Sequence, residues 1–238
     1  MSATSTSIES SANTYRTPTF WGGLWRMSGV HFVVMFVVAY AIYGYQPAVG
    51  AAPDALVAFY AGSRIRILVA AVIAGVAILN LMWFAAAIRT TLAERAQDGW
   101  GAAATAASAA VGALFLLDVT VGAALACSIA AAGNQGLASA LNDLSWACVV
   151  VSSFPRAMLV MAGTFGLWRA GLVSNTWFSG GVAAVVLVLL GGTTWLGDGF
   201  WSPAGAYSRF VSPIIVLAWI VLATRVLVTR APAPRTGW

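Results

Sequence analysis

The sequence predicts an all-α integral membrane bundle of six transmembrane helices with both termini in the cytoplasm. Of the 238 residues, 61% are hydrophobic and only 8% are charged, whereas a soluble domain carries about 25% charged residues. The apolar residues gather in stretches of about 20, which is the length that crosses the hydrocarbon core of a bilayer. Because lipid offers no hydrogen bonds to the backbone, each stretch has to be helical.

Six stretches of sequence meet this length criterion. They cover residues 29–46, 66–88, 103–131, 141–168, 177–196 and 209–228. Pro47 follows the first, and Pro213 falls in the first turn of the last, where a missing N–H costs little. We find no internal repeat, so one bundle over residues 29–230 is the simplest organisation. We expect a polar tail and interfacial aromatic segment over 1–28 and a short cytoplasmic tail over 231–238.

Arginine placement predicts the orientation, because cytoplasmic connections of membrane proteins carry the excess of positive charge. With the N-terminus inside, the cytoplasmic segments hold Arg16, Arg26, Arg89, Arg95, Arg169, Arg225, Arg230 and Arg235. The outer segments hold only Arg64, Arg66 and Arg209. Eight against three places both termini on the cytoplasmic side. The 28 residues before the first stretch exceed a usual signal-peptide n-region, so we expect a retained anchor in the plasma membrane.

Composition excludes several kinds of chemistry. All twelve basic residues are arginine, so no lysine can form a Schiff base or serve a Walker-type phosphate site. The single histidine excludes a paired-histidine haem or metal site made by this chain alone. Cys127 and Cys148 are too few for a zinc ribbon, and we expect them to pack as small apolar residues, with a disulfide left open. We expect no cofactor, no metal and no nucleic-acid partner.

Two ionisable residues lie near the middle of apolar stretches, Asp118 in the third and Arg156 in the fourth. If the intervening connection is centred near Gly136, Asp118 lies 18 residues before it and Arg156 lies 20 after it. Antiparallel helices rise equally per residue, so both charges should lie at similar depth. An intramembrane charge is a functional candidate whose partner should be named. We expect these two to form an intramembrane polar pair, either a structural staple or a proton or ligand site.

Nearby polar residues suggest a wider site. Pro155 removes a backbone donor and can open the fourth helix one turn earlier. Ser152 and Ser153 could satisfy the freed carbonyl or border a ligand-binding notch. Asn80, in the middle of the second stretch, could bond to a neighbouring helix or join Asp118 in a polar cluster.

The last outer connection, residues 195–210, is the most distinctive loop. Trp201 suits an aromatic belt at the interface, and Asp198 could pair with Arg209 across the loop. We interpret the segment as an anchored interfacial loop, or alternatively as a lid or docking surface. Paired small residues such as Gly180 and Gly181 allow close helix contact within the bundle or with another subunit.

Three segments carry a resemblance to a known family: RIRILVAAVIAG, AAAIRTTL and FGLWRAGLVSNTWFSGG. With the absence of lysine and the abundance of alanine and arginine, the chain resembles a family of small uncharacterised bacterial, actinobacterium-like, multi-pass membrane proteins. The resemblance implies a helical bundle in the bacterial inner membrane. It implies no activity and no catalytic residues.

The sequence therefore favours a non-enzymatic membrane protein, either an accessory or assembly subunit or a binder of a lipid or other hydrophobic molecule. Its expected partners are the lipid bilayer and other membrane subunits or further copies of itself. The alternative is a small proton-coupled transporter with a midplane polar site at Asp118, Arg156 and Asn80. An intramembrane enzyme with Asp118 as general acid is less favoured, because pairing with an arginine opposes proton donation at neutral pH.

Overall fold

The computed structural model describes residues 25–130 and 132–230, and it is helical in all of the elements found there. Residues 1–24 of the expected N-terminal tail and the expected tail 231–238 lie outside the described residues. Trp25, from the expected interfacial segment, packs against the main core.

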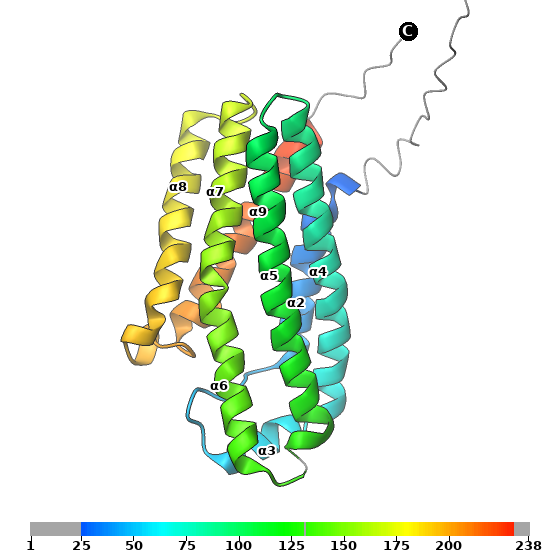
Figure 1. The fold of residues 1–238 in the computed structure, drawn as a ribbon, viewed down its shortest axis with the longest axis vertical. Helices are drawn as coiled ribbons and strands as arrows, with labels where there is room; N and C mark the ends of the chain where they lie inside the picture. The colour runs from blue at the N-terminus through cyan, green and yellow to red at the C-terminus, as the bar shows by residue number, and fades with distance from the viewer. Residues whose placement is uncertain (1–24, 131, 231–238) are drawn as a thin grey trace, which may run out of the picture.

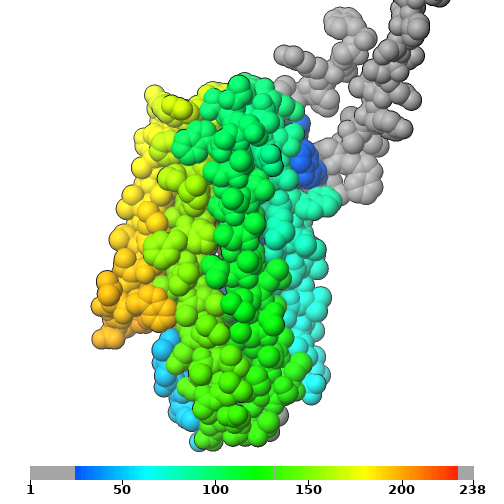
Figure 2. Space-filling model, viewed as in Figure 1, coloured from blue at the N-terminus to red at the C-terminus, as the bar shows by residue number. Residues whose placement is uncertain are grey.

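Most of the long helices run along one long axis, and the last one crosses behind them at a slant (Figure 1). In the view of Figure 1, α8, α7, α5 and α4 form a front row, and α2 and α9 lie behind it. The space-filling view shows the same elongated body, with α8 at one side and α4 at the other (Figure 2). The main helices are α2 (Ser28–Tyr43), α3 (Pro53–Tyr60), α4 (Arg64–Ala93), α5 (Asp98–Ala124), α6 (Gln135–Val151), α7 (Ser153–Arg169), α8 (Asn175–Leu190) and α9 (Ser212–Arg230). Shorter turns are η1 (Leu125–Ile129), η2 (Gly191–Leu196), η3 (Gly199–Trp201) and η4 (Tyr207–Val211).

Five helices in the described part of the chain are long and apolar enough to cross a membrane. They cover Arg64–Ala93, Asp98–Ile129, Gln135–Arg169, Asn175–Leu196 and Tyr207–Thr229. The first expected stretch is helical only as far as Tyr43, because Gly44 takes a left-handed φ of +83° and ends α2. α2 has 16 residues and is therefore about 24 Å long, shorter than the hydrocarbon core of a typical bilayer.

Helix α3 lies in a region where the sequence predicted no element. Pro53 begins it with a φ suited to the first helical turn, and Asp54 follows in that turn, where a negative charge favours the helix dipole. Leu56 and Tyr60 are fully buried and pack with Leu125 of η1. α3 thus closes the end of the bundle at which α6 begins (Figure 1).

Small residues let the helices approach closely, as their density predicted. A Cβ added at Gly163 would lie 2.5 Å from the Trp219 ring, and one at Gly166 would lie 2.5 Å from Leu92. These contacts hold α7 against α9 and α4. Buried Phe84 and Ile88 fill the centre of the same core.

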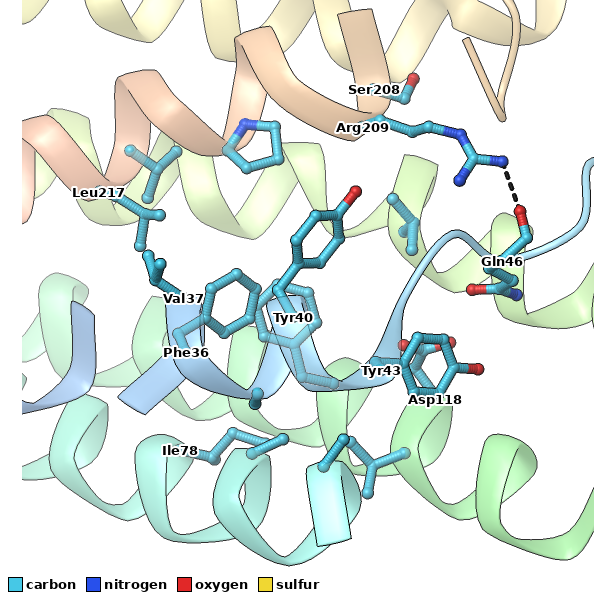
Figure 3. Close-up of a pocket in the computed structure, with 18 of the residues that line it drawn as sticks. Phe36, Val37, Tyr40, Tyr43, Gln46, Ile78, Asp118, Ser208, Arg209 and Leu217 are labelled. Carbon is cyan, nitrogen blue, oxygen red and sulfur yellow. Dashed lines mark hydrogen bonds between the residues drawn. The ribbon is translucent and has the colours of Figure 1, made fainter. Parts of the chain in front are cut away.

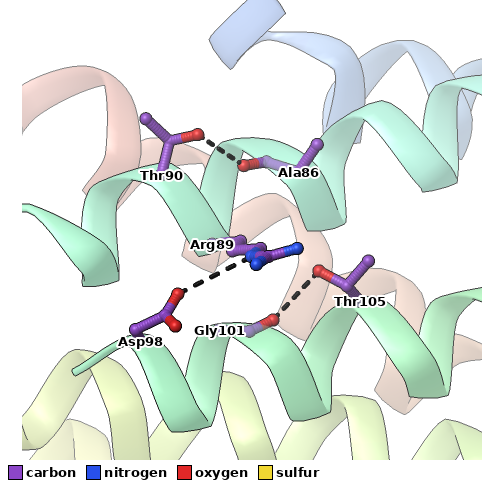
Figure 4. A network of polar contacts seen from close by, with 6 residues as sticks. All are labelled: Ala86, Arg89, Thr90, Asp98, Gly101 and Thr105. Carbon is purple, nitrogen blue, oxygen red and sulfur yellow. Dashed lines mark hydrogen bonds and ion pairs between the residues drawn. The ribbon is translucent and has the colours of Figure 1, made fainter.

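The connection between α4 and α5 carries an ion pair. Arg89 Nε lies 3.6 Å from Asp98 Oδ1, and nearby hydroxyls of Thr90 and Thr105 donate to carbonyls of their own helices (Figure 4). Both charged side chains are more than half exposed, so the pair contributes little to stability.

Candidate functional site: a cavity inside the bundle

A cavity of about 260 Å³ lies among α2, α4, α5, α6, α7, η4 and α9. Apolar side chains make up most of its wall: Phe32, Phe36, Val37, Ile67, Ile78, Phe115, Val149, Ile214, Val216 and Leu217. Polar groups gather toward one end, where Figure 3 shows Tyr43, Gln46, Asp118, Ser208 and Arg209. An apolar pocket with a few convergent polar groups is the usual form of a small-molecule site.

Asp118 receives a hydrogen bond from the Ser145 hydroxyl of α6. Ser145 in turn accepts from Gln46 Nε2 at 3.0 Å. Next to it, Asn142 accepts from the Tyr60 hydroxyl at 2.9 Å and donates to the carbonyl of Ala48 at 3.1 Å. Both Asn142 and Tyr60 have no exposed surface. This network joins α3, α5 and α6 at the polar end of the cavity.

Burial raises the pKa of the Tyr60 hydroxyl above its ordinary value. The group therefore stays protonated and keeps its role as the donor to Asn142.

The segment of residues 44–52, which we call the strap, runs from α2 across α6. Its contacts with α6 are polar: Trp146 Nε1 donates to the carbonyl of Pro47 at 2.8 Å. The amide of Gly50 donates to Asp143 Oδ1 at 3.1 Å. Because the strap has no regular structure of its own, these bonds with α6 fix its path.

Arg209 secures the strap from the other side. Its Nη2 donates to the carbonyl of Gln46 at 2.7 Å, and its Nε donates to the carbonyl of Ala204 at 2.6 Å. The guanidinium carbon also lies 3.9 Å from the centre of the Tyr45 ring and 4.4 Å from that of Trp146. A planar guanidinium suits this combination of hydrogen bonding and stacking.

In the described part of the chain, Asp198 and Arg209 form no ion pair. Arg209 is only 5% exposed and faces the strap, whereas Asp198 lies exposed in the connection between α8 and η4. The backbone forms the π-helical turn η4 at Arg209, which carries the side chain inward from the start of the last helix. Trp201 packs on Tyr207, with ring centroids 4.3 Å apart.

Asp118 and Arg156 line the same cavity, but in the described residues no ion pair joins them. The reason is the position of the turn before α6. Asn134 caps α6 by accepting from the amide of Leu137, so the connection is centred near residue 132 rather than Gly136. Asp118 lies 14 residues before that centre, Ser145 lies 13 after it, and Arg156 lies 24 after it. Equal rise therefore places Ser145, and not Arg156, opposite Asp118.

Arg156 lies at the break between α6 and α7, where the sequence predicted an opening at Pro155. Its Nη2 donates to the carbonyl of Val149 at 3.0 Å and to Ser153 Oγ at 2.9 Å. Ser152 interrupts the helix, and its hydroxyl donates to the same Val149 carbonyl at 2.6 Å. Arg156 is 4% exposed, and its Nε has no hydrogen-bond partner among the described residues.

Asn80 does not join this site. Its side-chain amide donates to the carbonyl of Val76 on its own helix and approaches Met35 Sδ of α2 at 3.8 Å. It does not line the cavity, so the alternative cluster of Asn80 with Asp118 and Arg156 is not formed. The helix face on which Asn80 lies is directed toward α2.

The site also contains residues that the sequence analysis missed. Gln46, Tyr60, Asn142 and Ser145 supply most of its polar contacts. Asn142 and Ser145 had a usable signal, since polar residues three apart share a face of an apolar helix. Gln46 and Tyr60 gave no such signal in the sequence. Gln46 is positioned by the strap and Tyr60 by α3, and neither element was predicted.

No protein-family model, curated protein or solved structure matches this chain.

Proposed function

We propose that this protein is a non-enzymatic integral membrane protein that holds a lipid or another hydrophobic molecule in its bundle cavity. The single observation that carries the proposal is the cavity itself. Its wall is apolar over most of its area; most of its polar groups gather at one end, and Arg156 lies apart from them. Such a wall favours an apolar chain through the hydrophobic effect, and a polar group on the wall can orient a head group.

The proposed setting is the plasma membrane, with six spans and both termini in the cytoplasm. α2 is the first of the six spans along the chain and is shorter than the others, and Arg26 precedes it. The start of α2 and the end of α9 lie at the same end of the bundle as the α4–α5 connection (Figure 1). Reporter fusions after Ala51 and after Arg230 test this arrangement, since we expect opposite sides for the two sites.

Native mass spectrometry of the gently extracted protein tests the binding function. We expect a monomer or homo-oligomer that carries a defined small hydrophobic molecule. Ala74 of α4 lines the cavity, so Ala74→Phe should expel that molecule. Val72, on the same helix and 69% exposed, gives the control Val72→Phe, which should retain it. Retention by both variants would contradict the cavity as the site, and co-eluting subunits at fixed stoichiometry without a ligand would favour an accessory subunit.

A proton-coupled transporter remains the second candidate. It is favoured by Asp118, a carboxylate on the cavity wall, and by the helix break at Ser152 beside the same cavity. Transport is tested in proteoliposomes that contain a pH-sensitive dye. The small-molecule fraction of a bacterial lysate is added outside them as the source of substrate. A transporter would acidify the lumen, and Asp118→Asn would abolish the change while leaving the protein folded.

A further inference from the structure

Arg156 is an uncompensated charge on the wall of the cavity. It is 4% exposed, and both of its hydrogen bonds use one nitrogen, Nη2. Its acceptors are a carbonyl and a hydroxyl, and in the described part of the chain no carboxylate lies within ion-pair distance of it. A buried charge without a counter-charge is costly, and inside a membrane it indicates a functional site.

The other charges of the cavity do not compensate for Arg156. Ser145, the partner of Asp118, precedes Arg156 by 11 residues, which is a separation of about 16 Å along the helix axis. Arg209 is a second cation, and its guanidinium is engaged with carbonyls of the strap and of the preceding loop. The region around Arg156 is therefore suited to an anion.

The cavity also opens sideways between α2 and α9. Val37 and Tyr40 of α2 line it and are 50% and 40% exposed, and Ile214 of α9 lines it and is 60% exposed. The Tyr40 ring meets Phe210 edge to face across this opening, with centroids 6.4 Å apart. Both helices are apolar, so the opening faces the hydrocarbon of the bilayer in the proposed membrane setting.

We propose that the cavity takes a single-chain amphiphile with an acidic head group. The anion pairs with the Arg156 guanidinium, and the apolar chain passes between α2 and α9 into the lipid. A volume of about 260 Å³ is smaller than typical sites for drug-sized ligands, so it accommodates one chain rather than two. This inference rests on the proposed binding function and adds the chemical class of the ligand.

Photoreactive probes that share one diazirine-bearing hexadecyl chain and differ in their head group test the inference. The heads are a carboxylate, a phosphate monoester, a neutral alcohol and a trimethylammonium, and the full chain in nanodiscs is labelled and mapped by peptide mass spectrometry. We expect labelling on α2 and α9. An acidic head should reach half-saturation at a concentration at least about tenfold lower than the alcohol, as a charge-assisted hydrogen bond allows.

Variants identify the arginine responsible. Arg156→Gln should remove the preference for an acidic head and leave labelling by the alcohol unchanged, whereas Arg156→Lys should keep much of the preference. Arg225→Gln is the matched control, since it removes one exposed arginine at the far end of α9 and should change nothing. If Arg156→Gln does not fold, the comparison of the four head groups on the unaltered protein still tests whether the cavity prefers an acidic head.

The outcomes separate the two proposals. Equal labelling by all four heads would overturn the acidic head group and leave the hydrophobic binding function standing. Preferential labelling by the ammonium probe would also overturn the acidic head group. Failure of every probe to label α2 or α9 would overturn both proposals. A preference for the phosphate over the carboxylate, or the reverse, would support the inference and assign the acid.

Discussion

Two adjacent glycines of α8 meet different surroundings, and the same substitution should therefore have opposite effects at them. A Cβ added at Gly181 would lie 2.4 Å from Thr164 Cγ2 and 2.5 Å from its Oγ1. A Cβ added at Gly180 would meet no heavy atom of the described residues within 4 Å. Thr164 is fully buried, and its hydroxyl accepts from Trp219 Nε1 at 3.0 Å, so it has little room to move.

The expected magnitude follows from these contacts. Overpacking a filled site costs about 1–3 kcal/mol, and displacing Thr164 from Trp219 loses a hydrogen bond of about 1 kcal/mol. Helix propensity favours alanine over glycine by up to about 1 kcal/mol at both positions. Since propensity cancels between neighbours, Gly181→Ala should be less stable than Gly180→Ala by about 2–4 kcal/mol. Gly180→Ala should equal or exceed the unaltered protein in stability.

Reversible unfolding in mixed micelles of mild detergent and SDS, followed by tryptophan fluorescence, measures the difference. A second variant checks the cause: adding Thr164→Ala to Gly181→Ala removes the clashing atoms and should recover part of the loss. Equal unfolding free energies for Gly180→Ala and Gly181→Ala would refute the close approach of α7 and α8. If the changes in unfolding free energy caused by Gly181→Ala and Thr164→Ala simply add in the double variant, the Thr164 side chain is not the cause of the loss.

Three further predictions concern the network, the strap and the cysteines. Asn142→Ala should lower the unfolding free energy by about 2–4 kcal/mol, because it leaves the buried Tyr60 hydroxyl unsatisfied and removes the hydrogen bond to the Ala48 carbonyl. Adding Tyr60→Phe removes the unsatisfied hydroxyl and should restore about 1 kcal/mol of unfolding free energy in the same SDS titration. Strictly additive effects of the two substitutions would count against the hydrogen bond between Tyr60 and Asn142. Arg209→Lys should speed proteolytic cleavage within the strap, since lysine cannot reproduce the stacked fork; an unchanged cleavage rate would oppose the clamping role. Exposed Cys127 should react with N-ethylmaleimide before buried Cys148, as peptide mass spectrometry would show, and equal rates would contradict the burial.

Hydropathy predicted the helical architecture because the constraint behind it is general. Every apolar stretch in lipid has to satisfy its own backbone. Each expected stretch is mostly helical in the structure, the fourth as α6 and α7 on either side of Ser152. α3 was not predicted, because a helix of eight residues is too short to give a transmembrane signal. Its only fully buried side chains are those of Leu56 and Tyr60. Such a helix is stabilised by tertiary packing rather than by its own composition.

The sequence indicated some residues of the candidate site but paired them wrongly. The wrong pairing came from the position assumed for the turn before α6. Asp118 and Arg156, which the sequence singled out as an intramembrane polar pair, both line the cavity. Their pairing depended on a connection placed four residues too late, and Asn134, which begins α6, was not recognised as a helix cap. A shift of that size changes the relative register by about 12 Å across two antiparallel helices, enough to exchange Arg156 for Ser145 as the partner of Asp118.

If the proposed ligand occupies the cavity, the strap affects how quickly that ligand can leave. The strap continues directly from the end of α2 that borders the opening between α2 and α9, so widening the opening at that end has to pull on the anchors of the strap. Four of the hydrogen bonds that hold it, made through Gln46, Pro47 and Ala48, contribute about 1 kcal/mol each. If these four bonds have to break before the occupant leaves, its exchange is slowed by about a thousandfold relative to an untethered helix end. The residence time of the occupant would then be set by the protein more than by the occupant itself.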